Sequence, residues 1–446
     1  MTTVLPSPHV AEAPPRRGRW IDDWRPEDPA FWATTGARVA RRNLVLSILS
    51  EHIGFSVWTL WSVLVLFLGP EYHVDAAGKF LLTAVPALIG SVLRLPYTFA
   101  VATFGGRNWT IVSALLLLVP TVAIAIVLEP GVPYTTLVVC AALAGVGGGN
   151  FASSMANINA YYPNRLKGWA LGINAGGGNI GVAAVQLVGL LVLATAGAAH
   201  PRLVAGVYIP LIVIAALGAA LWMDNLSSAR NDRRAMREVA RDPHTWIMSF
   251  LYIGTFGSFI GFGFAFGQVL QVQFKAEFAT PIAAAYLTFL GPLLGSLIRP
   301  VGGWMADRLG GALVTFWTFV AMAAAAGLVL LASQRHSLAL YLIGFISLFV
   351  FSGVGNGSTY KMIPAIFRAR YADEPRARRL SGALIGIAGA VGAFGGVLVN
   401  VAFRQSFLTY STGDGAVAAF IVFYAACVAV TWAVYLRRSA RRLAGV

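Results

Sequence analysis

Long apolar stretches alternate with short polar ones along most of the chain. Each apolar stretch holds about 20 residues, which is the length that an α-helix needs to cross a hydrocarbon layer of about 30 Å. The pattern predicts about twelve membrane-spanning helices, at residues 43–68, 80–103, 108–128, 133–161, 168–196, 203–223, 245–272, 281–305, 312–332, 338–366, 380–403 and 415–436.

The composition supports this interpretation. Hydrophobic residues make up 57% of the 446 residues and charged residues only 11%, and the mean hydropathy is +0.71. Because a soluble globular chain carries about 25% charged residues, we expect an all-α integral membrane protein embedded in a lipid bilayer.

The net charge of +15 would fit nucleic-acid binding, but its distribution along the chain indicates membrane topology instead. If the N-terminus is cytoplasmic, 25 of the 33 Lys and Arg residues fall on the cytoplasmic side of the predicted helices. The five on the other side are Lys79, Arg202, Lys275, Arg335 and Arg404. This bias follows the positive-inside rule, so we expect both termini to be cytoplasmic and no nucleic-acid partner.

The polar segments are too short for a catalytic domain. We predict a cytoplasmic tail at 1–42, a basic connecting loop at 224–244 and a second tail at 438–446, and the N-terminus has no apolar stretch typical of a cleaved signal. The glycine runs at Gly353 and Gly389 lack the ending or the preceding strand of a phosphate-binding loop. Cys140 and Cys427 carry no disulfide or metal motif. We therefore expect no enzyme, no cofactor and no metal.

The two halves of the chain resemble each other. The segment Pro86-Ala-Leu-Ile-Gly-Ser-Val-Leu-Arg94 matches Gly291-Pro-Leu-Leu-Gly-Ser-Leu-Ile-Arg299 at a shift of 205 residues. This repeat predicts two six-helix bundles, at 43–223 and 245–437. Carriers built from such repeats bind their substrate near the bilayer midplane, between the repeats.

Arg94 and Arg299 occupy the same place in the two repeats, within predicted helices. A buried arginine in a membrane helix costs several kcal/mol, so two at equivalent positions indicate a paired cationic site. Snorkelling to the surface remains an alternative for Arg299, which lies closer to a helix end. A guanidinium donates bidentate hydrogen bonds to planar oxyanions, and nitrate and nitrite are small planar anions.

One loop segment resembles a signature of the major facilitator superfamily. Gly302-Gly-Trp-Met-Ala-Asp307-Arg308-Leu-Gly-Gly311 is similar to the motif that this superfamily carries between its second and third helices. The copy in the first half, Phe104-Gly-Gly-Arg107, lacks the aspartate. The resemblance implies a gating role for Gly302, Asp307 and Arg308.

Further segments resemble the nitrate/nitrite porter family of this superfamily. They are residues 147–158 with 170–182, residues 355–364, and the shorter stretches 93–97 and 252–262. The resemblance implies that Arg94 and Arg299 clamp the anion, that Phe151 and Phe256 sandwich it, and that Asn179 and Tyr252 hydrogen-bond it. Phe55 would line the cavity. Asn174 belongs to a cluster of asparagines expected along a wet central path, because buried amides need partners.

Three titratable side chains are candidates for proton coupling. Glu51 and His52 lie in the first predicted helix, and Lys361 lies in the tenth. Glu51 precedes Phe55 by four residues and therefore shares its helix face. A carboxylate that neutralises an arginine in the empty carrier favours nitrate/proton symport, whereas unpaired arginines favour nitrate/nitrite exchange. A purely structural pairing of Glu51 with His52, and snorkelling of Lys361, are the alternatives.

The prediction is thus a nitrate importer of the bacterial cytoplasmic membrane that works as a monomer, with protons or nitrite as the coupled species and a role in nitrate assimilation. A facilitator-type carrier of a drug or sugar is the second hypothesis, but neutral cargo needs no buried cations. A membrane receptor or scaffold is the third, and no segment outside the membrane is long enough for a ligand-binding domain.

Overall fold

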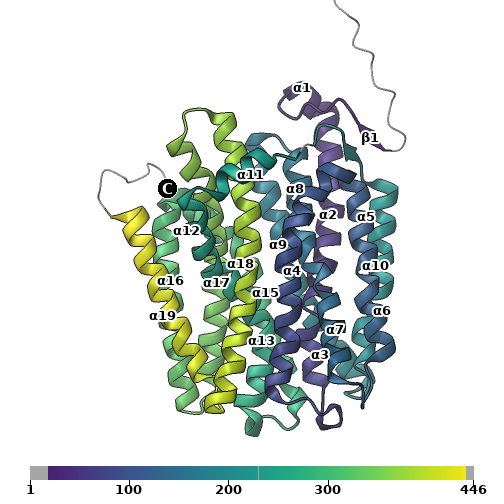
Figure 1. The fold of residues 1–446 in the computed structure, drawn as a ribbon, viewed down its shortest axis with the longest axis vertical. Helices are drawn as coiled ribbons and strands as arrows, with labels where there is room; N and C mark the ends of the chain where they lie inside the picture. Colours follow the sequence, from purple (N-terminus) through teal and green to yellow (C-terminus); the bar gives the residue numbers. More distant parts are fainter. Residues whose placement is uncertain (1–18, 230, 438–446) are drawn as a thin grey trace, which may run out of the picture.

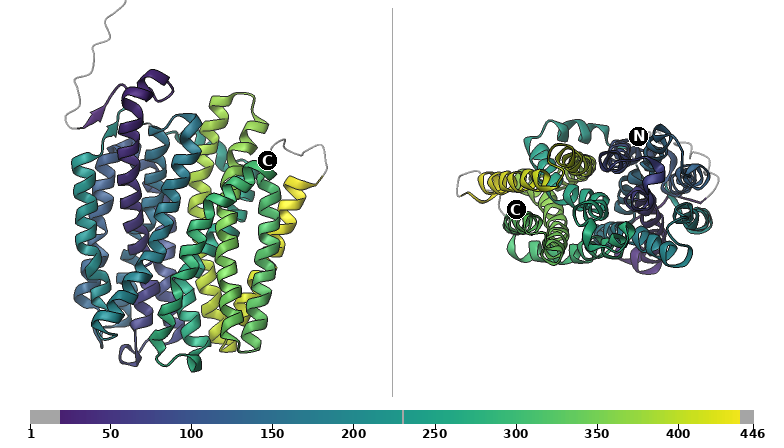
Figure 2. Two further views of the ribbon diagram at one scale, coloured as in Figure 1. Left: turned by 180° about the vertical axis from the view of Figure 1, so that it is seen from behind. Right: turned by 90° about the horizontal axis from the view of Figure 1, so that it is seen from below.

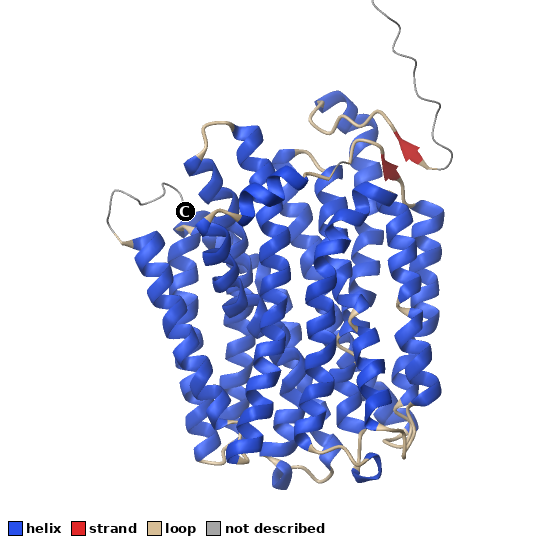
Figure 3. Ribbon diagram, viewed as in Figure 1, coloured by secondary structure: helices blue, strands red, loops and turns tan. Residues whose placement is uncertain are grey.

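The computed structural model describes residues 19–229 and 231–437, and almost all of them are helical (Figure 3). Within this part of the chain, twelve helices are long and apolar enough to cross a membrane. The first six are Pro29–Phe67 (α1 to α3), Ala76–Phe104 (α4), Gly106–Val127 (α5 and α6), Tyr134–Tyr161 (α7 and α8), Asn164–Ala196 (α9) and Arg202–Trp222 (α10). The other six are Pro243–Gln273 (α12 and α13), Ile282–Leu309 (α14 and α15), Gly311–Gln334 (α16), Leu338–Arg370 (α17), Glu374–Tyr410 (α18) and Asp414–Leu436 (α19 and a final turn).

The helices of the two halves gather on opposite sides of the molecule (Figures 1 and 2). Helices from α2 to α10 form one group and helices from α12 to α19 form the other. The groups meet where α4 packs against α18 and α9 packs against α15. This arrangement agrees with the internal repeat, since each half contributes six spans.

Several helices extend beyond the apolar stretches that predicted them. The first span begins at Pro29, although its apolar stretch begins at residue 43, and the eleventh begins at Glu374, although its apolar stretch begins at residue 380. The additional turns carry exposed charged residues, among them Arg38, Arg41 and Arg378. Hydropathy detects only the part of a helix that contacts hydrocarbon, so polar turns that project from the membrane were missed.

The connection between the halves is structured as well. Strand β2 (Asn225–Leu226) pairs in parallel with β1 (Trp20–Ile21), and the helix α11 (Arg233–Ala240) follows. These elements lie on the same face of the molecule as α1 (Figure 1). We call it the arginine-rich face, because Arg19, Arg25, Arg38, Arg41, Arg42, Arg107, Arg165, Arg233, Arg234, Arg237 and Arg241 surround the helix ends there. Arg16, Arg17, Arg230 and the tail 438–446 lie outside the described residues.

Ion pairs tie this connection to the second half. Asp232 accepts a hydrogen bond from Arg379 of α18 at 2.5 Å, and that guanidinium holds the pKa of the Asp232 carboxyl below its usual range. Glu238 pairs with Arg376 of the same helix. The α11 segment is therefore docked on α18.

Glycines bring the equivalent helices of each half into close contact. A Cβ on Gly148 of α8 would lie 2.6 Å from the Cα of Gly90 in α4, and a Cβ on Gly353 of α17 would lie 2.2 Å from the carbonyl oxygen of Gly295 in α15. Any larger residue would separate these helix pairs. Arg94 and Arg299 each lie one turn after the close contact in their own helix, so the packing fixes them at equivalent depths.

Candidate functional site

Arg94 is fully buried in α4 and is held by backbone carbonyls of both halves. Its Nε donates to the carbonyl oxygen of Gly148 at 3.2 Å and its Nη1 donates to that of Gly389 in α18 at 2.8 Å. Nη2 has no hydrogen-bond partner among the described residues. A buried guanidinium with a free N–H group is suited to bind an anion.

Four aromatic rings surround the Arg94 guanidinium. Its Cζ lies 4.5 Å from the ring centroid of Phe151, 4.9 Å from Phe256, 5.3 Å from Trp58 and 6.0 Å from Phe55. Cation–π contacts of this kind stabilise a desolvated guanidinium by about 2 kcal/mol. The rings therefore surround the guanidinium and offset part of the cost of burying it.

The rings of Phe151 and Phe256 face each other across the boundary between the halves. Their centroids are 6.1 Å apart and their planes are inclined by 26°. A planar anion between two rings needs planes about 7 Å apart, which is twice a van der Waals contact. A sandwich of the kind that the resemblance implies therefore requires the two halves to separate slightly at this point.

Arg299 has fewer protein contacts than Arg94. It is 6% exposed, its Nη2 lies 3.5 Å from the hydroxyl of Tyr252, and its Cζ lies 5.3 Å from the ring centroid of Tyr360. Its Nη1 has no hydrogen-bond partner within the described chain. Neither arginine forms an ion pair with any described carboxylate.

A π-helical turn joins the surroundings of the two arginines. Ile253–Gly257 interrupts the seventh span between α12 and α13, and such turns are frequent at functional sites. It places Phe256 beside Arg94 and, one turn earlier, Tyr252 beside Arg299, with the two rings stacked at 5.3 Å. The chain thus connects both cations through one pair of rings.

Buried asparagines in the described chain carry amides without partners. Asn179 in α9 and Asn356 in α17 are fully buried, and neither amide atom of either residue has a hydrogen-bond partner among the described residues. Asn150 in α8 is 3% exposed and has the same lack of partners. Because burying an unsatisfied amide is costly, these side chains are suited to a polar ligand or water.

Glu51 is fully buried in α2 and is held by two neutral side chains. Its Oε2 accepts from the hydroxyl of Ser154 at 2.5 Å and from the amide of Asn174 at 2.7 Å, while Oε1 has no described partner. Gly178 makes room for this carboxyl, since a Cβ there would lie 2.2 Å from Oε1. The structure therefore places Asn174 in the Glu51 network.

The remaining predicted residues contact groups other than the two arginine side chains. His52 is hydrogen-bonded through Nδ1 to the carbonyl oxygen of Gly177 at 3.1 Å. Lys361 donates to both carboxylate oxygens of Asp307, at 2.8 and 2.9 Å, in an exposed ion pair between α17 and α15. Gly302 lies against the backbone of Val354.

Arg308 completes the environment of the loop motif, because its Cζ lies 4.2 Å from the ring of Trp304. The Lys361–Asp307 pair and the contact of Gly302 with Val354 join α15 to α17, whereas the Arg308 contact lies within α15.

A cavity of about 70 Å³ reaches Arg94 from the arginine-rich face. Its lining includes Arg94, Phe151 and Gly389 at one end, and Asn159 and Gly382 at the other. It can hold a few water molecules or a small anion. The access path therefore runs between α8, α9 and α18.

The sequence did not single out Trp58, Ser154, Asn356 or Tyr360. Asn356 and Tyr360 fall within the 355–364 segment that resembles a family signature, and Ser154 falls within the 147–158 segment. Those segments could have identified them. Trp58 reads as one more apolar residue in an apolar helix, and only its contact with Arg94 distinguishes it.

Comparison with known proteins places the chain in a family. The model of the Major Facilitator Superfamily matches residues 47–400. The crystal structure of a D-xylose-proton symporter superposes with a TM-score of 0.68, over 88% of this chain and 97% of that one, at 14% identity. A likeness at this identity supports the fold and confirms the predicted all-α membrane architecture.

Two curated relatives are similar over almost their full length. The nitrate/nitrite transporter NarU of Salmonella typhimurium is 36% identical over 454 residues, covering 95% of this chain and 97% of that protein. The probable nitrate/nitrite antiporter NarK2 of Thermus thermophilus is 34% identical, covering 96% and 98%. The chain therefore belongs to the nitrate/nitrite porter family of the major facilitator superfamily.

Proposed function

We propose that this protein imports nitrate by alternating access and that it couples nitrate to protons. The observation that carries this proposal is the pair of buried arginines, each with one terminal nitrogen free of described partners. Nitrate presents three oxygens in a plane, so it can accept hydrogen bonds from Arg94 and Arg299 at the same time. The printed names of the relatives as nitrate/nitrite transporters support this substrate.

The substrate site lies between the two bundles, residues 43–223 and 245–437. Arg94, Phe55 and Phe151 come from the first bundle, and Arg299 and Phe256 come from the second. Asn179 and Tyr252 donate or accept the remaining hydrogen bonds. Because the contacts come from both bundles, the anion links the two bundles when it binds, and their rearrangement around the bound anion opens the opposite side.

Glu51 is the group that we assign to the proton. It is the one described acid with no exposed surface. It also lies on the same helix face as Phe55, whose ring is one of the four around the Arg94 guanidinium. A proton on Glu51 and an anion on the arginines change the charge of the site in opposite senses. Each therefore lowers the electrostatic cost of the other, and linkage makes their binding mutually favourable.

Nitrate/nitrite exchange is the second candidate. Neither arginine is paired with a described carboxylate, and two uncompensated cations resist moving through the membrane while the site is empty. An exchanger avoids that step because an anion always accompanies the arginines. The printed name of NarK2 as a probable antiporter supports this alternative.

Uptake of labelled nitrate into proteoliposomes distinguishes the two. A symporter accumulates nitrate on a pH gradient without internal nitrite. An exchanger ignores the gradient and requires internal nitrite or nitrate. Absence of nitrate uptake under both conditions contradicts the proposed substrate.

We also propose that both termini and the 224–244 connection are cytoplasmic. The charge distribution supports this orientation, since basic residues gather at the face that carries α11. A tag after Val446 and a tag within 224–244 should both resist labelling from outside intact cells. Labelling of either tag overturns the orientation.

A further inference from the structure

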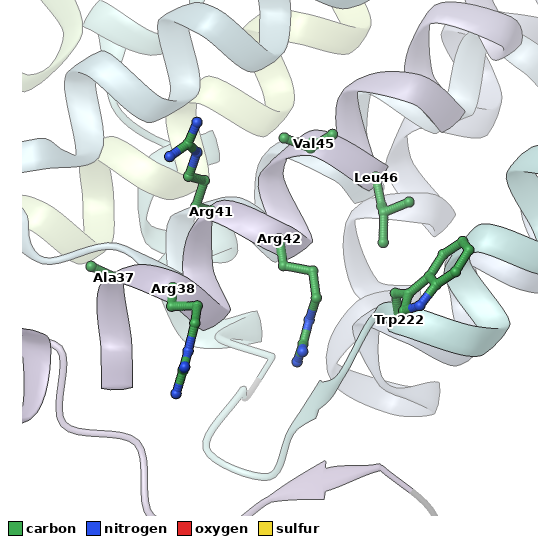
Figure 4. A pocket seen from close by; sticks show the side chains of 7 residues that line it. All are labelled: Ala37, Arg38, Arg41, Arg42, Val45, Leu46 and Trp222. Atoms are coloured by element: carbon green, nitrogen blue, oxygen red, sulfur yellow. The ribbon is translucent and has the colours of Figure 1, made fainter. Parts of the chain in front are cut away.

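A groove of about 560 Å³ lies at the arginine-rich face, between the beginning of α2 and the end of α10 (Figure 4). Arg38, Arg41 and Arg42 of α2 line its polar part, and Leu46 and Trp222 line its apolar part. Figure 4 shows Arg38 and Arg42 extending in the same direction, while Arg41 extends from the other side of α2. The groove shares no lining residue with the cavity at Arg94.

The groove carries positive charge that the described protein does not neutralise. Arg38 and Arg41 are exposed and form no ion pair with any described acid. Arg42 pairs with Asp224, but Arg19 binds the other oxygen of the same carboxylate at 3.1 Å. One negative charge is therefore shared by two guanidinium groups.

The end of α10 does not compensate this charge. Arg107 donates to the carbonyl oxygen of Ala220 through two nitrogens, one of them at 3.1 Å, and Arg19 donates to that of Leu221. The negative end of the helix dipole is thus already covered by cations. The groove retains an excess of positive charge.

The other part of the groove is apolar and exposed. Val45 is 57% exposed and Trp222 is 55% exposed. In Figure 4 both lie with Leu46 on one side of the groove, and Val45 follows the arginines along α2 toward the middle of the first span. Tryptophans at the end of a spanning helix are typical of the boundary between hydrocarbon and headgroups. The groove therefore has a cationic end at headgroup depth and an apolar end at acyl-chain depth.

We propose that this groove binds one anionic phospholipid of the bilayer leaflet on the arginine-rich side. Arg38 and Arg42 would donate to the phosphate, and Trp222 with Val45 would contact the upper part of an acyl chain. Basic pockets between spanning helices hold anionic headgroups by this combination. A free phosphate would use only the cationic end, so the apolar end favours a lipid.

The test is native mass spectrometry of the purified protein with added phosphatidylglycerol or phosphatidylcholine. The wild-type protein should retain one phosphatidylglycerol molecule and should retain phosphatidylcholine less strongly. Arg38→Gln should weaken phosphatidylglycerol binding about fivefold, the effect of one arginine near the lipid surface. Trp222→Ala should weaken retention of both lipids. Arg38 is exposed, so this variant should fold normally, and a thermal melt checks that it does.

Arg233→Gln is the matched control, because Arg233 is exposed on the same face in α11 and its loss changes the net charge equally. It should leave phosphatidylglycerol retention at the wild-type level. Equal losses in Arg38→Gln and Arg233→Gln would mean a diffuse surface charge and would overturn the site. Retention of glycerol 3-phosphate as strong as that of phosphatidylglycerol would overturn the lipid assignment.

Discussion

Arg94 and Arg299 occupy equivalent positions in the repeat, but their surroundings differ. Arg94 donates to two backbone carbonyls and lies within four aromatic rings. Arg299 has a long contact with one tyrosine hydroxyl and one ring beside it. The cation of the first half is thus held rigidly by groups from both halves, whereas the cation of the second half has room to adjust.

This difference indicates a division of roles between the halves. A cation fixed by carbonyls is preorganised for the anion and loses little entropy when the anion binds. A cation with few contacts can follow the anion as the bundles move. Glu51 lies in the first half, so the group that we propose to accept the proton is on the same side as the rigid arginine.

The largest effect is expected from replacing either arginine by lysine. Arg94→Lys and Arg299→Lys should each lower nitrate transport by about a hundredfold, because an ammonium cannot form the bidentate contact and loses about two charge-assisted hydrogen bonds. Both proteins should still insert in the membrane. Transport in proteoliposomes measures the effect, and normal uptake by either variant removes that arginine from the site.

Thermal unfolding of the same two variants sharpens the comparison. Arg94→Lys should melt at a lower temperature than Arg299→Lys, since the carbonyls of Gly148 and Gly389 lose their donors. The expected difference between the two variants in the free energy of unfolding is about 1–3 kcal/mol. Equal melting temperatures would show that the contacts of Arg94 do not fix it.

Glu51→Gln should abolish accumulation driven by a pH gradient while keeping nitrate exchange. The amide mimics the protonated carboxyl and cannot release a proton, but nitrate still binds the arginines. Counterflow compared with gradient-driven uptake separates the two activities. His52→Ala should have the smaller effect, because its ring contacts the Gly177 carbonyl. Wild-type accumulation by Glu51→Gln would make Glu51 a structural residue.

Gly178→Ala tests the placement of Glu51 without changing that residue. The new Cβ would lie 2.2 Å from Oε1, and the carboxyl can move away only by losing Ser154 or Asn174. We expect gradient-driven uptake to fall several-fold, with a destabilisation of about 1–3 kcal/mol. Gly176→Ala is the control in the same helix, because no atom lies within 4 Å of its Cβ position. Identical behaviour of the two variants would contradict the geometry.

The smallest effects concern the tyrosines beside Arg299. Tyr252→Phe removes the one hydroxyl that Arg299 contacts and should lower the affinity for nitrate by about three- to tenfold. Tyr360→Phe keeps the ring that faces Arg299 and should change the affinity for nitrate less than Tyr252→Phe does. Binding isotherms of the two variants measure the difference, and a larger loss in Tyr360→Phe would reverse the assignment.

The sequence predicted the twelve spans and the burial of both arginines, because hydropathy and a charge within an apolar stretch are properties of single helices. Contacts between helices were harder to predict. Trp58 is one apolar residue among many in its helix until α4 brings Arg94 beside it. Asn174 shares a helix with Asn179. Only the close packing of α2 on α9 at Gly178 brings the Asn174 amide within hydrogen-bond distance of Glu51.

In the proposed mechanism, one anion contacts both arginines. Calorimetric titration of nitrate into purified wild type, Arg94→Lys and Arg299→Lys tests this most directly, because it measures binding without transport. We predict that both variants lose at least about tenfold in affinity, the value of one charge-assisted hydrogen bond, in spite of the different surroundings of the two side chains. Wild-type affinity in either variant would show that a single arginine binds the anion and would contradict the account.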